Sequence, residues 1–247
     1  IPDHLKRYLV EQTYERYTSE DHAVWRFILR ELTNFHFKNA HPSYRKGVKL
    51  TGITIDRIPT LKGIDKCLQK FGWRAAGVSG FIPPAAFMEL QAHRILPIAT
   101  EMRRLENLEY TPAPDIVHEA AGHAPMISDR AFSRYLERYA EVASKAVITK
   151  KDLDQYEAIR ELSDLKEHPD ATQSDIDRAY AKLERANEAI KEVTEASMLA
   201  RMGWWTTEYG LMGVENPKIY GAGLLSSVSE SREFLSPKVK KIPFSVD

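Results

Sequence analysis

The sequence predicts a mainly α-helical protein, an α+β chain whose strands are few and short. Apolar residues recur at helical spacing near the start of the chain and again between residues 150 and 197. Strand-like segments are brief and run into prolines. With 247 residues, 43% of them hydrophobic, the chain is long enough to bury a sizeable core.

The first helix is predicted over residues 22–32. Val24, Ile28 and Leu32 follow one another at steps of four, which places them on one helical face. Asp21 stands directly before this run, and aspartate is a preferred residue at a helix N-terminus. We therefore expect Asp21 to cap this helix.

The next elements are shorter. Residues 52–58 are expected to form a short strand or a turn, and a helix is expected over about 61–70, ending at Gly72. Residues 73–84 have a strand-like and loop-like composition that ends at two prolines. A further helix is expected over 85–96 because it carries several large apolar residues.

Residues 150–197 differ in composition from the rest of the chain. Two runs with apolar residues at helical spacing, rich in acidic and basic residues, flank the break His168-Pro169-Asp170. Thr172 with Asp175 three residues later resembles a capping box. The segment predicts an antiparallel helical hairpin with a solvated outer face.

Charge and cysteine content restrict the partners and the compartment. Lys plus Arg and Asp plus Glu number 35 each, so a formal charge of zero gives no attraction to nucleic acid or to an anionic membrane. Cys67 is the single cysteine and fits a reducing compartment, so a cytoplasmic location is expected. No apolar run approaches the roughly 18 residues of a membrane helix. Small molecules are the expected partners, and the sequence leaves the oligomeric state open.

Two histidines and a glutamate lie within six residues, His118, Glu119 and His123. The zinc-hydrolase pattern H-E-x-x-H requires histidines four residues apart. Here they are five apart, which is about 140° around a regular helix. They converge only if the helix loosens or ends between them; Gly122 permits this, and Pro125 is expected to stop the helix. A metal site is indicated, with two structural histidines as the open alternative.

Such a site needs an anionic third ligand. A thiolate is excluded because the chain has one cysteine, and the carboxylate candidates are Glu208, Glu215 and Glu230. On a helix, Glu208 would share one face with Trp204 and Leu211 and be buried. A buried carboxylate requires a compensating cation. That cation would be the metal or, alternatively, a nearby arginine.

Two histidines and one carboxylate with open coordination positions describe the facial triad of non-haem Fe(II) oxygenases. This set suits oxygen activation better than hydrolysis.

Long motifs then point to one family. Residues 110–125 resemble the iron-binding signature of the pterin-dependent aromatic amino acid hydroxylases, and residues 204–211 and 220–227 resemble two further signatures in the same order. Residues 78–84, followed by Phe87, resemble its pterin-binding stretch. The nearest likeness is to the bacterial phenylalanine 4-monooxygenases of the longer type. The resemblance implies the family's helical-basket catalytic domain, here with an inserted helical hairpin.

The resemblance also implies cofactors and site residues. It implies Fe(II) held by His118, His123 and Glu208, and tetrahydrobiopterin or a related reduced pterin as electron donor. Glu119 would be catalytic and would also face the pterin. The implied pterin contacts are Val78, Gly80, Phe81, Ile82, Phe87 and Ala200. The implied amino-acid contacts are Arg103, which would hold the substrate carboxylate, and Thr111, Pro114, Trp204, Tyr209, Gly223 and Ser226.

The activity implied is ring hydroxylation of an aromatic amino acid, L-phenylalanine to L-tyrosine in the first place, because Trp204 resembles the larger ring wall of the phenylalanine and tyrosine branches. The alternatives are a tyrosine or tryptophan hydroxylase, a zinc hydrolase with Glu119 as general base, and an inactive binding protein that docks through the hairpin.

The chain departs from the family pattern in three places. Gly203 stands where animal members commonly have an aromatic residue, which implies the loss of one pterin-side contact. His123 and Glu208 are 85 positions apart, more than in the shorter members, and the hairpin accounts for the excess. We expect residues 1–247 to form a single catalytic domain that stops short of the family's C-terminal end.

Overall fold

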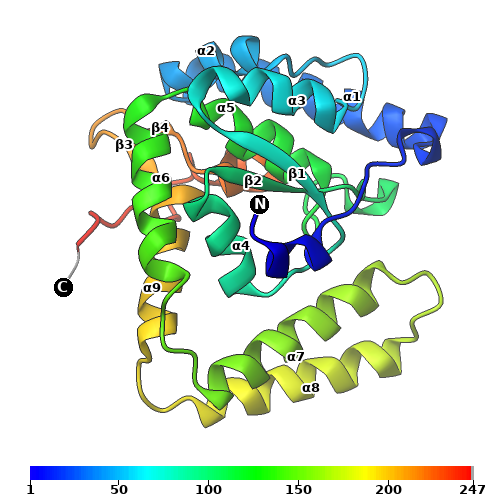
Figure 1. The fold of residues 1–247 in the computed structure, drawn as a ribbon, viewed down its shortest axis with the longest axis vertical. Coiled ribbons are helices and arrows are strands. Elements are labelled where there is room, and N and C mark those ends of the chain that lie inside the picture. Colours follow the sequence, from blue (N-terminus) through cyan, green and yellow to red (C-terminus); the bar gives the residue numbers. More distant parts are fainter. Residues whose placement is uncertain (246–247) are drawn as a thin grey trace.

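The computed structural model describes residues 1–245 and confirms a mainly helical fold with few short strands (Figure 1). The α-helices are α1 Ser19–Asn39, α2 Pro42–Thr51, α3 Leu61–Leu68, α4 Pro84–Ala92, α5 Ala124–Ile127, α6 Arg130–Ala143, α7 Lys150–Glu167, α8 Gln173–Ala189, α9 Glu195–Gly203, α10 Ala222–Ser226 and α11 Val228–Glu233. Two π-helices complete the helical elements: His118–His123 runs directly into α5, and Trp204–Glu208 directly continues α9. The strands are β1 Arg74–Val78, β2 Ile95–Ala99, β3 Leu211–Met212 and β4 Lys218–Ile219.

Helix α1 forms one side of the main core. Val24, Ile28 and Leu32 are buried, as their spacing predicts. The predicted cap at Asp21 is wrong by one turn, because the Thr18 side chain accepts the Asp21 backbone N–H and the Asp21 carboxylate accepts the Thr18 backbone N–H. This reciprocal pair is a capping box, in which the acidic residue occupies the third helical position.

The two-stranded sheet at the centre of the molecule includes residues that the sequence predicts to be helical. Residues 85–96 were expected to be one helix, but α4 ends at Ala92 and Ile95–Ala99 form β2, which pairs in parallel with β1. Arg94 adopts a left-handed backbone with φ of 57°, which turns the chain between the two elements. Every residue of β2 is buried, and a fully buried parallel strand has the same apolar composition as a buried helix segment.

The segments around α3 agree closely with the sequence prediction. Residues 52–58 form a turn rather than a strand, and α3 continues as a 3₁₀ turn over Gln69–Phe71. Gly72 closes that turn with a φ of 77°, a conformation that glycine adopts without steric strain.

The helical hairpin is confirmed as α7 and α8, which pack against each other along their length and lie to one side of the rest of the molecule (Figure 1). Both helices begin with a capping box, at Thr149 and at Thr172. The hairpin ends at Ala189 rather than near 197, because α9 begins at Glu195.

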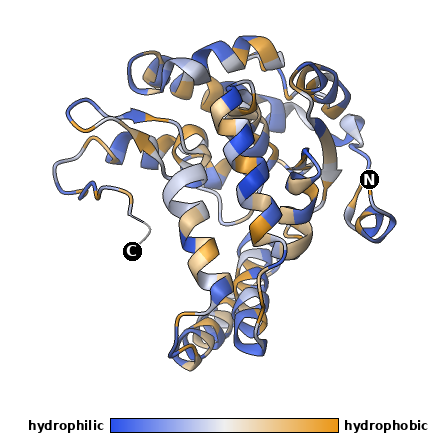
Figure 2. Cartoon of the chain, turned by 60° about the vertical axis from the view of Figure 1, so that its left-hand side comes forward, coloured by the Kyte–Doolittle hydropathy of each residue, from blue (hydrophilic) through white to orange (hydrophobic). Residues whose placement is uncertain are grey.

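The longer helices carry both hydrophilic and hydrophobic residues (Figure 2). Over the residues that the structure describes, we find no helix with the length and apolar character required to span a membrane.

Candidate active site

The two histidines of the site converge because the helix that carries them is a π-helix. His118–His123 form i→i+5 turns, so residues five apart lie above one another. The two imidazole rings meet edge to face, with centroids 5.0 Å apart and an interplanar angle of 80°. The predicted loosening of the helix is confirmed. The predicted stop at Pro125 is wrong, since α5 continues directly with Pro125 in its first turn, where no N–H is needed.

Gly122 permits a close helix contact. A Cβ at this position would lie 2.8 Å from the Ala222 carbonyl oxygen and 3.0 Å from the Ala222 Cβ. The absence of a side chain therefore lets α10 pack directly on the π-helix. Because α10 also carries Ser226, this contact fixes where that hydroxyl lies relative to His118.

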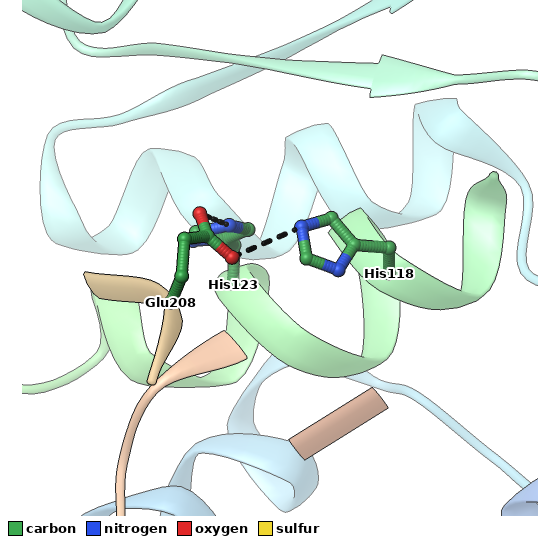
Figure 3. Close-up of side chains that lie close together, drawn as sticks. All are labelled: His118, His123 and Glu208. Atoms are coloured by element: carbon green, nitrogen blue, oxygen red, sulfur yellow. Dashed lines mark ion pairs between the residues drawn. The ribbon is translucent and has the colours of Figure 1, made fainter. Parts of the chain in front are cut away.

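Glu208 brings the third functional side chain from the other π-helix (Figure 3). Its Oε1 lies 2.9 Å from His123 Nε2, and its Oε2 lies 3.3 Å from His118 Nε2. The expectation that Glu208 shares a helical face with Leu211 is wrong, because the π-helix ends at Glu208 and Leu211 belongs to β3. Tyr209 donates a hydrogen bond to Glu230, which was one of the alternative carboxylates.

The donor set fits a bound cation. His118, His123 and Glu208 place one ligand atom each within 4.8 Å of one another. His123 Nε2 and Glu208 Oε2 are buried atoms that make no hydrogen bond of normal geometry, although they lie close to each other's side chains. A metal ion placed between these side chains would accept a lone pair from each of them. Two imidazoles and one carboxylate are ligands that iron accepts.

The charges of the site are strongly coupled. Burial alone would lower the pKa of His118, but the carboxylates of Glu208 and Glu119 outweigh it and raise that pKa to about 9. Burial alone would raise the pKa of Glu208, but the two imidazoles hold it well below its usual range. The carboxylate therefore stays ionised, and positive charge at the point where the three side chains meet, on a protonated imidazole or on a bound cation, stabilises it.

Ser226 sets the orientation of the His118 ring. Its hydroxyl donates to the Ala222 carbonyl at 2.7 Å, so toward His118 Nδ1, 3.0 Å away, it is left to accept. With the Nδ1 proton held by this hydroxyl, a metal ion would replace the proton on Nε2, which faces Glu208. The sequence singled out Ser226 as an amino-acid contact, and the structure places it beside a ligand of the site.

Asp115 joins two parts of the site. Its carboxylate forms two hydrogen bonds with the Arg103 guanidinium, at 2.6 and 2.9 Å, and accepts the His118 backbone N–H at 3.0 Å. The last of these bonds places Asp115 at the N-terminal end of the helical segment, where aspartate is a preferred residue. Its ion pair with Arg103 was missed, since no local pattern connects residues twelve positions apart.

Arg103 is buried, with its side chain 1% exposed. Its Nη1 has no hydrogen-bond partner among the described residues.

Glu119 is also buried, and burial raises the pKa of its carboxyl. Its Oε1 lies 4.0 Å from His118 Nε2, and its Oε2 makes no hydrogen bond among the described residues.

The residues expected to contact a pterin lie largely together. Val78 ends β1, and Val78 and Ile82 belong to one apolar cluster against which Phe87 of α4 packs. Gly80 has a φ of 52° and open space where a Cβ would stand. Phe81 is half-buried in the loop after β1, and Ala200 is exposed on α9.

The residues expected to contact the amino acid come from three segments. Thr111 and Pro114 lie in the loop before the first π-helix, where the Thr111 hydroxyl donates to the Ala113 carbonyl at 2.9 Å. Trp204 and Tyr209 flank Glu208 with ring centroids 5.8 Å apart, and Trp204 is 56% exposed. Gly223 of α10 lies so close to Tyr209 that a Cβ would meet its ring at 3.4 Å.

Known proteins with similar sequences include phenylalanine hydroxylases. The chain is similar to phenylalanine-4-hydroxylase of Mesorhizobium japonicum, with 28% identity over 244 residues that cover 97% of this chain and 72% of that protein. It is similar to phenylalanine-4-hydroxylase of Pseudomonas aeruginosa, with 30% identity over 89% of this chain and 68% of that protein. These two relatives and that of Chromobacterium violaceum are longer than this chain, which spans between 61% and 72% of their length.

A solved structure shares the fold. It is Chromobacterium violaceum phenylalanine hydroxylase with bound iron(III) and the oxidised cofactor 7,8-dihydrobiopterin. It superposes with a TM-score of 0.70 and 26% identity, covering 96% of this chain and 75% of that one. The sequence profile described as biopterin-dependent aromatic amino acid hydroxylase matches residues 9–153. The zinc hydrolase and the inactive binding protein are not favoured by these likenesses, and the chain belongs to the biopterin-dependent aromatic amino acid hydroxylase family.

Proposed function

We propose that this chain hydroxylates the ring of L-phenylalanine to give L-tyrosine, using Fe(II), dioxygen and a tetrahydropterin. The observation that carries the proposal is the meeting of His118, His123 and Glu208 at one point, in a chain of this family. The relatives named for phenylalanine support the choice of substrate.

His118 Nε2, His123 Nε2 and a Glu208 oxygen would hold the iron. Three protein ligands leave other coordination positions free for small reactants. Iron and reduced pterin together would supply the oxygen activation that amino-acid side chains cannot perform. The chain's own contribution is to hold these ligands in place: Ser226 orients the His118 ring, and Asp115 fixes the start of the π-helix.

The pterin is proposed to lie against Val78, Gly80, Phe81 and Ile82, with Phe87 stacked on its ring and Ala200 at its edge. The shared apolar cluster of Val78, Ile82 and Phe87 supports this placement. Glu119 is the catalytic carboxylate of the proposal. Its unpaired Oε2 would accept a hydrogen bond from the pterin or from a water beside the ligands, and so orient either one.

Arg103 is proposed to hold the substrate carboxylate. Asp115 already engages two guanidinium nitrogens, which fixes the plane of the group and leaves Nη1 as the donor that still lacks a partner. Thr111, Pro114, Gly223 and Ser226 would complete the pocket, and Trp204 and Tyr209 would form the wall beside the ring. With substrate bound, this wall would shield the ring from water and fix which ring carbon faces the iron.

The direct test is product formation from phenylalanine, tyrosine and tryptophan, each with ferrous iron and tetrahydrobiopterin. We expect tyrosine from phenylalanine, at a specificity constant at least about tenfold above that for the other two amino acids. No product without pterin or without iron is the matching control. Equal turnover of tryptophan would contradict the substrate, and turnover that persists with zinc under anaerobic conditions would contradict the reaction.

Two coarser features complete the proposal. We propose that residues 1–247 act as one catalytic unit, since a single core cluster takes residues from Val24 to Phe234. A cytoplasmic setting is proposed from the single cysteine, which requires no oxidising compartment.

A further inference from the structure

The α7–α8 hairpin contacts the segment that carries Arg103. The family profile ends at residue 153, just inside α7, so most of the hairpin lies outside the matched residues. Its helices are joined to each other, for example by Gln155 Nε2, which donates to Asn187 Oδ1 at 2.7 Å.

The base of the hairpin is tied to the start of α9. Thr194 donates its hydroxyl hydrogen to Asp152 Oδ1 at 2.7 Å, and the Val147 backbone N–H donates to Glu195 at 3.2 Å. The chain therefore enters and leaves the hairpin at one place. From there α7 and α8 run side by side toward the turn between them, away from α6 and α9 (Figure 1).

The far end of α7 reaches the loop between Arg103 and Asp115. Glu167 is the last residue of α7, and its Oε1 accepts a hydrogen bond from Asn107 Nδ2 at 3.0 Å. Asn107 ends a 3₁₀ turn, Leu105–Asn107, that begins two residues after Arg103. The contact spans 60 positions of sequence and joins the insertion to the segment that holds the guanidinium.

Glu167 lies among the charges of this segment. Burial raises the pKa of its carboxyl, the Asp115 carboxylate raises it further, and Arg104, Asn107 and Arg103 act in the opposite direction. Elsewhere the loop is held by the Glu109 carbonyl, which accepts the Ser227 hydroxyl at 3.1 Å and the Ser229 hydroxyl at 3.2 Å. Glu167 thus holds one side of a loop whose other side is tied to the start of α11.

We propose that Glu167 is a positioning residue for the amino-acid site, and that the inserted hairpin is part of the substrate-binding machinery rather than a peripheral decoration. By accepting the Asn107 amide, Glu167 fixes the turn at 105–107 and with it the approach to Arg103 and Thr111. The inference rests on the proposed function, because it assigns the loop to the substrate carboxylate.

Glu167→Ala tests this directly. We expect the KM for phenylalanine to rise about fivefold while kcat and the KM for pterin stay within about twofold, the size of effect that one partly exposed hydrogen bond produces. Glu167→Gln keeps an oxygen that accepts from Asn107, so it should restore the KM to within about twofold of the unsubstituted enzyme. Asn107→Ala should match Glu167→Ala, and the double variant should be no worse than either.

Asp164→Ala is the matched control, since it removes a carboxylate from the same helix one turn earlier, where Asp164 meets Arg160 on the exposed face. Its KM should not change. Hydrogen exchange of the peptide covering residues 104–110 gives a readout without turnover: exchange should accelerate in Glu167→Ala and not in Asp164→Ala.

An unchanged KM and unchanged exchange in Glu167→Ala would overturn the inference. So would a Glu167→Gln variant as impaired as Glu167→Ala, since charge and not the hydrogen bond would then be responsible. If the unsubstituted enzyme hydroxylates none of the three aromatic amino acids, the proposed function fails, while the exchange measurement still decides whether the hairpin holds the loop.

Discussion

His118 is oriented by a single hydroxyl, and this makes Ser226 the most informative residue after the ligands themselves. Ser226→Ala removes the acceptor for Nδ1–H without changing any ligand atom. Loss of such a partner typically weakens metal binding about ten- to a hundredfold. We predict that increase in the dissociation constant for Fe(II), measured by anaerobic titration.

Ser231→Ala is the control for that variant, because Ser231 is equally buried and its hydroxyl donates to the Val228 carbonyl within its own helix. Its iron affinity should equal that of the unsubstituted protein. An unchanged affinity in Ser226→Ala would show that the hydroxyl does not set the ring.

His36 links stability to pH. It is buried against the Leu225 carbonyl, with its Nε2 2.9 Å from that oxygen, and burial lowers its pKa from 6.5 to about 4. The unfolded chain therefore binds a proton that the folded chain does not, at every pH between those two values. The contribution of His36 to stability is full above pH 6.5 and is lost as the pH falls toward 4.

This shift corresponds to about 3 kcal/mol of unfolding free energy. Urea unfolding at a series of pH values should show that loss in the unsubstituted protein and a flatter profile in His36→Gln, whose amide can still donate to Leu225. Equal slopes in the two proteins would contradict the assignment.

At the scale of elements, the close contact between the first π-helix and α10 determines how Ser226 lies relative to His118. Gly122→Ala would place a Cβ 2.8 Å from the Ala222 carbonyl oxygen, and this is backbone that cannot rotate away. Forced overpacking of this kind costs about 1–3 kcal/mol. We predict that loss in urea unfolding together with weaker iron binding, because Ser226 moves with α10. Full stability with an alanine at 122 would show that the two helices have room to separate.

Which elements the sequence could predict depends on where their determinants lie. The α7–α8 hairpin was predictable because the cap at Thr172 and the charge on its outer face are local features. Strand β2 was mistaken for the end of a helix, since a buried parallel strand lacks the alternation that identifies strands. The loosened helix was predictable from the five-residue spacing of His118 and His123, which a regular helix cannot bring together.

At the scale of the whole molecule, the long family motifs predicted which side chains meet, although 85 positions separate His123 from Glu208. What the motifs did not contain is the pairing of Arg103 with Asp115, or the contact of Glu167 with Asn107. Both contacts result from tertiary packing between segments that share no sequence pattern. The surface against which an inserted pair of helices lies is set by tertiary contacts alone.

The central claim is that three side chains from two π-helices bind one ferrous ion. Anaerobic titration with Fe(II), followed by removal of weakly bound metal and iron analysis, tests it in the unsubstituted protein and in Glu208→Ala. We predict about one iron retained per chain in the first and almost none in the second, since two imidazoles without an anion hold the ion poorly. Retention of iron by Glu208→Ala with unchanged affinity would contradict the account.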